Sequence, residues 1–183
     1  MNKAFPLFFL FLGIASSIAC HHSNKTVTDT KPKESKIIDS TFDIQLKVEE
    51  LENGDYYLVA AVELYDGSFI ISPFSEDDFF SPFNMEITKS VFIISENTLL
   101  EIPVSLPEID PIINKPVRFV RDKTTYKRNL IVVEKEDFEV NGLIEFVLEP
   151  SCVPYDVEFV ISQKAKKLFV KKTNTFISKE YKR

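Results

Sequence analysis

Cys152 is the residue of this chain whose type and setting are best suited to chemistry. Prolines stand two residues to either side of it, at Pro150 and Pro154, and alternating apolar runs flank the whole stretch. A thiol on a turn between two strands can exchange with the disulfide of a partner. The simpler interpretation is a small buried apolar residue at the start of a strand. Glu149 and Asp156 stand close in sequence and disfavour the thiolate that exchange requires.

Other catalytic and metal-binding sets are absent from the sequence. His21 and His22 are the only histidines and both precede the folded body, which excludes a histidine-assisted serine or cysteine nucleophile there. Two adjacent histidines in a polar linker lack the further fixed ligands of a metal site. The sequence contains no glycine-rich phosphate loop and no Gly-x-Ser-x-Gly elbow. We therefore expect a non-enzymatic protein without metal or cofactor.

The N-terminus has the composition of a secretory signal. Lys3 supplies a short positive region, residues 5–14 are mostly apolar, and small residues follow them. The apolar run is too short to span a bilayer as a permanent helix. We expect a signal peptide over residues 1–19.

Cys20 follows this segment directly. The Ile18-Ala19-Cys20 sequence resembles the lipobox of bacterial lipoproteins, in which the cysteine is acylated, although Ser17 replaces the usual leucine. We expect Cys20 to carry the lipid that attaches the protein to a membrane, with the polar stretch 20–40 as a flexible tether. An ordinary signal peptide with Cys20 left as a spare thiol is the alternative.

Charge is unevenly distributed along the chain. The net charge of −6 argues against binding to nucleic acid, whose phosphates favour a basic surface. From Lys164 to the end, however, there are eight Lys and Arg residues and one acid. We expect a basic C-terminal tail over residues 164–183, which is solvated or rests on the acidic body or on anionic lipid. The start of this stretch, residues 164–169, fits either one helical turn or a last strand.

The body between these segments has the pattern of β-strands. Residues 41–50 alternate between apolar and polar side chains, as in a half-buried antiparallel strand. Asn53-Gly54 favours a tight hairpin turn, and the nearly continuous apolar run 56–65 fits a central strand. Further short strands recur at intervals of about 8–12 residues. The sequence predicts an all-β, immunoglobulin-like antiparallel β-sandwich over residues 41–163.

The stretch 72–83 differs from the strands around it. Pro73 and Pro82 exclude a central strand, so we expect an exposed or capping loop. Phe79 and Phe80 require cover, which a loop folded back over the sheet would supply. The three acids at 76–78 lack the ligand spacing and the glycine of a calcium loop, so we interpret them as solvated. Ligand or ion binding by this loop is a further hypothesis.

Four short segments carry a further signal: Ser68-Phe69-Ile70-Ile71-Ser72-Pro73-Phe74, Gly142-Leu143-Ile144-Glu145-Phe146, Cys152-Val153-Pro154-Tyr155 and Val157-Glu158-Phe159. They resemble motifs in the N-terminal periplasmic domain of DsbD-type thiol:disulfide interchange proteins. The resemblance implies an immunoglobulin-like sandwich, in agreement with the strand pattern.

The resemblance also implies a pair of redox cysteines, and here the chain departs from it. Cys152 fits the second cysteine, whereas Val147 or Leu148 stands where the first is expected. A disulfide needs two sulfurs about 2 Å apart, so the family's two-electron chemistry does not carry over.

Two functional hypotheses follow. The first is a non-enzymatic lipoprotein of the bacterial cell envelope, periplasmic or surface-exposed, that binds an unidentified protein or supports an assembly. The second is a thiol-disulfide partner protein that acts through Cys152 alone.

Overall fold

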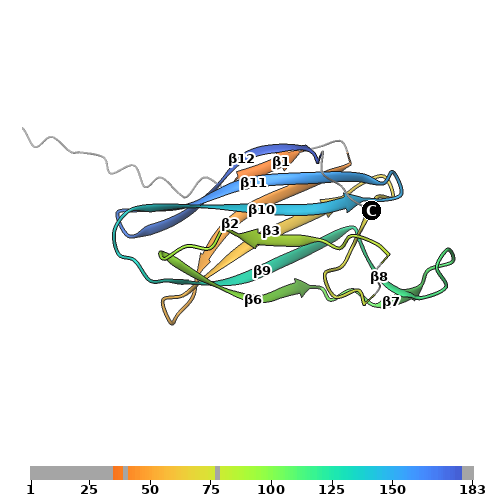
Figure 1. Ribbon diagram of the computed structural model, residues 1–183, viewed down its shortest axis with the longest axis horizontal. Coiled ribbons are helices and arrows are strands. Elements are labelled where there is room, and N and C mark those ends of the chain that lie inside the picture. Colours follow the sequence, from red (N-terminus) through yellow and green to blue (C-terminus); the bar gives the residue numbers. More distant parts are fainter. Residues whose placement is uncertain (1–34, 39–40, 77–78, 179–183) are drawn as a thin grey trace, which may run out of the picture. The chain divides into compact units, whose positions relative to one another are not determined.

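The computed structural model describes residues 35–38, 41–76 and 79–178 (Figure 1). Every regular element in these ranges is a β-strand, and none of them contains a helix that could cross a membrane. The strands are β1 (Ser35–Ile38), β2 (Phe42–Glu50), β3 (Tyr56–Leu64), β4 (Phe69–Ile71), β5 (Asn84–Ile87), β6 (Ile93–Ile102), β7 (Pro107–Ile109), β8 (Pro116–Arg121), β9 (Lys123–Val132), β10 (Phe138–Leu148), β11 (Val153–Lys164) and β12 (Lys167–Ile177).

Two antiparallel sheets form the sandwich. One has the strand order β1-β2-β3-β9-β6 and the other has the order β12-β11-β10-β5. A smaller sheet, β4-β8-β7, lies at one end of them (Figure 1). The prediction of an all-β, antiparallel β-sandwich is confirmed.

Strand alternation builds the core. In β2 the side chains of Phe42, Ile44 and Leu46 are all 0% exposed, because they share the face that packs against the second sheet. The β2–β3 turn contains the predicted Asn-Gly pair, in which Gly54 has a φ of +85° and Asn53 Oδ1 accepts a hydrogen bond from the Asp55 N–H at 3.1 Å. Positive φ is accessible to glycine at no steric cost, which explains the residue at this position.

Aromatic side chains link the two sheets at the centre of the core. The ring of Phe42 meets those of Phe146 and Tyr155 edge-on, at centroid distances of 5.1 and 4.8 Å. Phe83 stacks on Tyr126 at 3.9 Å, and both are almost completely buried. Such pairs contribute about 0.5–1.5 kcal/mol beyond the area that they bury.

The sandwich extends beyond both predicted boundaries. β1 lies within the stretch predicted as tether, where it pairs with β2, and β12 lies within the stretch predicted as a basic tail, where it pairs with β11. Leu168 and Val170 of β12 point into the core while lysines flank them, so the high charge hid the alternation. Residues 167–177 therefore form a strand of the domain rather than part of a tail.

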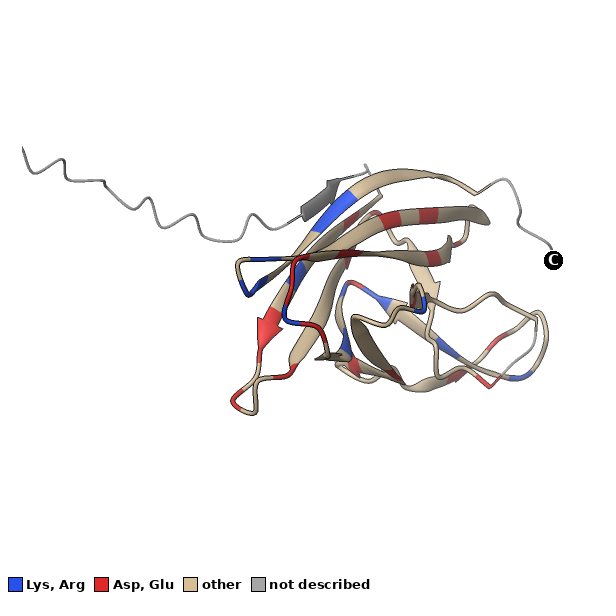
Figure 2. Cartoon of the chain, turned by 60° about the vertical axis from the view of Figure 1, so that its left-hand side comes forward, with Lys and Arg blue, Asp and Glu red and all other residues tan. Residues whose placement is uncertain are grey.

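The β11–β12 turn, which carries basic residues, lies beside the acidic loop that precedes β10 (Figure 2). The Ala165 N–H donates to Asp137 Oδ1 at 3.0 Å, and Lys164 lies 3.9 Å from Glu139. Gln163 Nε2 donates to the backbone carbonyls of Glu134 and Glu136 in the same neighbouring loop. These contacts join the β11–β12 turn to the acidic loop before β10, while Lys166 and Lys167 stay exposed.

Candidate functional site

Cys152 lies on the turn between β10 and β11. Its φ is +53°, and the last paired residues of the hairpin, Leu148 and Val153, lie on either side of the turn. The thiol is exposed, and its Sγ lies 3.1 Å from Glu149 Oε2, so that the sulfur donates to a carboxylate. This exposure excludes the interpretation of Cys152 as a small buried apolar residue.

The described residues contain no second thiol beside Cys152. Val147 and Leu148, which occupy the place of a first redox cysteine in the resemblance, are 3% and 2% exposed and pack as apolar side chains. Cys20, the predicted lipidation site, lies outside the described residues. An intramolecular disulfide within the described part of the chain is therefore ruled out.

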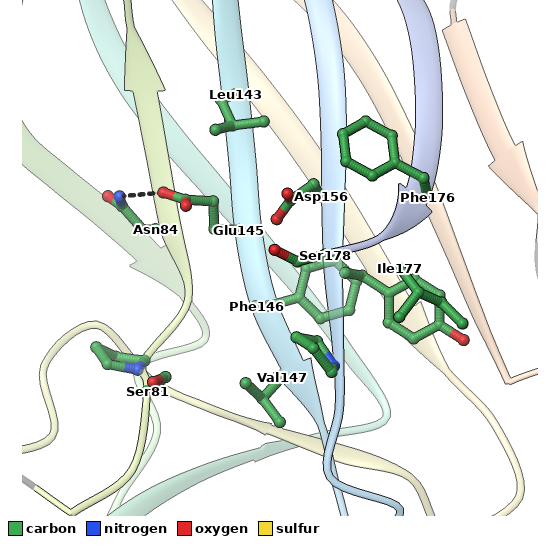
Figure 3. Close-up of a pocket in the computed structure, with 13 residues that line it drawn as sticks. Ser81, Asn84, Leu143, Glu145, Phe146, Val147, Asp156, Phe176, Ile177 and Ser178 are labelled. Carbon is green, nitrogen blue, oxygen red and sulfur yellow. Dashed lines mark hydrogen bonds between the residues drawn. The ribbon is translucent and has the colours of Figure 1, made fainter. Parts of the chain in front are cut away.

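A groove of about 860 Å³ lies over the outer face of β10 and β11, close to this turn (Figure 3). Glu145 and Asp156 are directly opposite each other on these strands, and Asn84 Nδ2 donates to Glu145 Oε2 at 3.1 Å. Facing like charges destabilise a sheet, and they favour a basic side chain or a cation in the groove. Among the described residues, however, no group of three metal-ligating side chains exists.

An aromatic and basic cluster lies beside the Cys152 turn. The backbones of Phe69 and Glu149 exchange hydrogen bonds of 3.0 and 2.8 Å, which joins β4 to the turn. The guanidinium of Arg121 lies over the rings of Phe69 and Phe119, at 5.4 and 4.8 Å from their centroids. No basic residue lies near Cys152 in the sequence. The position of Arg121 near the turn follows only from the pairing of β8 with β4.

The 72–83 loop differs from its prediction at the two phenylalanines. Phe79 is 66% exposed and Phe80 is half-buried, and neither belongs to the core. Their rings contact each other edge-on at 5.0 Å. For Phe79 the expected cover is not observed, because Phe83 at the end of the loop occupies the core position instead.

A row of exposed apolar side chains follows the end of β6 and the β7–β8 hairpin, and we call it the apolar arm. Its residues are between 52% and 79% exposed: Ile102, Val104, Leu106, Ile109 and Ile112. A contiguous patch of exposed aliphatic side chains is typical of an interaction surface.

The tip of the apolar arm is held by hydrogen bonds rather than loose. Asp110 is 6% exposed, and its Oδ1 accepts from the N–H groups of Ile112 and Ile113 at 2.9 and 3.0 Å. The backbone of Asp110 also bonds to those of Asn114 and Lys115, which closes the turn. Ile112, 79% exposed, is therefore presented on an ordered turn. Side chains held in place before binding lose less entropy on association.

Comparison with known proteins adds one solved structure. No known family model matches the chain, and no curated protein matches it in sequence. The N-terminal periplasmic domain of ScsB from Proteus mirabilis is similar to it, at 12% sequence identity and a TM-score of 0.49. The match covers 72% of this chain and 51% of that one, so the chain spans about half the length of the solved domain. The sandwich fold follows from the two sheets themselves.

Proposed function

We propose that the protein is a non-enzymatic, lipid-anchored module of the bacterial cell envelope that binds another protein through the apolar arm. The observation that carries this proposal is the exposure of five aliphatic side chains around an ordered turn. Burying one such side chain contributes about 1.5–3 kcal/mol. A few of them therefore supply much of the roughly 8 kcal/mol of a micromolar complex.

The chemistry of the apolar arm favours a protein over a lipid surface as its occupant. Among the described strands, β7 pairs with β8 on one side only, so its other edge offers backbone donors and acceptors. A partner strand can satisfy these groups, whereas lipid tails cannot. Glu108 in the middle of β7 is also charged and exposed, and a carboxylate in hydrocarbon is costly.

The location rests on the sequence of the N-terminus. The signal-like residues 1–19 and the lipobox-like Cys20 support export and acylation, which gives a lipoprotein in the periplasm or on the cell surface. The acidic net charge of −6 supports a protein partner rather than nucleic acid.

A photo-crosslinking side chain in place of Ile112 is expected to trap a protein partner in the intact envelope. The matched control is Val91, which is equally exposed, at 81% against 79%, and lies outside the apolar arm. Identical adducts from both positions would contradict the proposal.

In the same experiment, Cys20→Ser is expected to move the protein from the membrane fraction to the soluble fraction.

Leu106→Ser combined with Ile109→Ser is expected to abolish the Ile112 adduct. The thermal midpoint of unfolding is expected to stay nearly unchanged, because both side chains are more than half exposed, at 76% and 66%. Surface substitutions of this kind usually change stability by about 0.5 kcal/mol or less.

A second candidate function is thiol-disulfide exchange through Cys152, and the exposure of its Sγ favours it. In this reaction the Cys152 thiolate attacks a partner's disulfide, forms a mixed disulfide and releases the partner's other sulfur as a thiolate. A maleimide is expected to label the native protein at Cys152. Non-reducing capture from the envelope is then expected to show a linked partner that disappears in Cys152→Ser. If the wild type and Cys152→Ser both captured the same partner without a disulfide link, binding through the apolar arm would remain as the function.

A further inference from the structure

A second cavity lies between β5 and β6. In the second sheet, β5 is the edge strand on the side away from β12. Both β5 and β6 are the outer strands of their sheets at this side of the sandwich. The cavity has a volume of about 890 Å³ and is lined in part by Ile87, Ile93 and Leu143. Cavities of this size accept small organic molecules. Neither Cys152 nor any residue of the apolar arm contributes to its lining.

Arg128 forms the polar centre of this cavity. It belongs to the inward-facing row of β9, between Tyr126 and Leu130, and only 9% of it is exposed. Opposite it, the register of β6 shifts between Ser95 and Leu99, so that residues 96–98 bulge out of the ladder. Arg128 pairs with Leu99 at the edge of this irregularity, and its side chain lines the cavity.

The guanidinium of Arg128 has few partners for a buried cation. Its Nη1 donates to the backbone carbonyl of Glu96 at 3.2 Å, and its buried Nε has no acceptor. Among the described residues, no carboxylate forms an ion pair with it. Burial lowers the pKa of the Arg128 guanidinium, and the charge of Glu86 partly offsets that effect. A guanidinium nevertheless stays protonated in proteins, so the site holds an incompletely compensated positive charge.

We propose that this cavity binds a small organic monocarboxylate, with the carboxylate on the guanidinium of Arg128. The planar fork of a guanidinium matches two carboxylate oxygens. Ile87 and Ile93 offer apolar contact to the body of the ligand, and hydroxyl and amide groups of Ser95 and Asn97 line the same space.

The charge of the lining selects a singly charged group over a phosphate dianion. Arg128 and Lys89 contribute two positive charges, and Glu86 contributes one negative charge. The sum is one net positive charge, which a single carboxylate neutralises. A phosphate dianion would be left with an excess negative charge beside Glu86.

The test follows the Nε–H resonance of Arg128 by NMR during titration with acetate, butyrate and hexanoate, with chloride exchanged to hold ionic strength constant. We expect a saturable shift with the carboxylates and none with butyramide, the neutral analogue of butyrate. Phosphate is expected to bind more weakly than butyrate. An unmoved resonance with all three carboxylates at 100 mM, or tighter binding of phosphate, would overturn the proposal.

Variants provide a second measurement. Butyrate is expected to raise the melting temperature of the wild type and of Arg121→Met, a surface control, but not that of Arg128→Met. Arg128→Met should fold, because it replaces an incompletely paired buried charge with an apolar side chain. Glu86→Gln is expected to tighten butyrate binding about threefold to tenfold, since it removes a nearby negative charge. Equal stabilisation of Arg128→Met and the wild type by butyrate would refute the assignment.

Discussion

Gly142→Ala is expected to destabilise the sandwich by about 3 kcal/mol, at the upper end of overpacking effects. Gly142 lies in β10 with Phe159 as its partner on β11 and Ile87 as its partner on β5. A Cβ at this position would lie 2.2 Å from Phe159 Cζ and 2.9 Å from the Glu86 carbonyl oxygen. Phe159 is 1% exposed, so its ring is part of the packed core, and moving it to admit a methyl group disturbs that packing.

The free energy of unfolding in urea measures the loss of stability in Gly142→Ala. Two further variants test whether the contact with Phe159 causes that loss. Gly54→Ala is the matched control, because a Cβ there meets nothing within 4 Å and the change tests only the φ of +85°. It is expected to cost about 1–2 kcal/mol, the usual penalty for a side chain in the left-handed region. In the Gly142→Ala, Phe159→Leu double variant, the loss of stability is expected to be smaller than the sum of the losses measured for the two single variants. Strict additivity would show that the ring does not oppose the new methyl group.

Alternation and turn chemistry made most of the strands predictable from the sequence. The period of two over Phe42, Ile44 and Leu46 appears in the structure as three fully buried side chains. The Asn53-Gly54 pair marks the turn between β2 and β3. In both cases the signal is local, since strand alternation and hairpin turns depend on residues that are neighbours in the chain.

The C-terminal strand was not predictable because its turn has no usual signal. Ala165 and Lys166 join β11 to β12 with φ values of +49° and +64°, the geometry of a type I′ turn. Such a turn normally contains Asn, Asp or Gly. Pairing along most of β11, from Tyr155 to Lys164, outweighs the local backbone preference of these two residues.

The two candidate sites also differ in whether a local sequence pattern predicts them. The turn position of Cys152 is visible in the sequence through the flanking prolines and alternating runs. Arg128, by contrast, occupies one position in an ordinary alternating strand. Its burial against the irregular part of β6 depends on pairing between strands about 30 residues apart in sequence, and no local pattern encodes that.

Phe83→Ala is expected to destabilise the protein by about 3–5 kcal/mol, as for other fully buried aromatic residues. Phe83 is 1% exposed and stacks on Tyr126, and its N–H donates to the Ile71 carbonyl at 2.8 Å. The side chain therefore anchors the end of the 72–83 loop in the core between the sheets. The free energy of unfolding in urea gives the size of the loss.

Phe79→Ala is the matched control, because it removes the same ring from the same loop at a position that is 66% exposed. Its expected effect on stability is about 0.5 kcal/mol or less. A loss of several kcal/mol from Phe79→Ala would restore the interpretation in which Phe79 and Phe80 cover the sheet. A large loss from Phe83→Ala alone assigns that cover to the end of the loop.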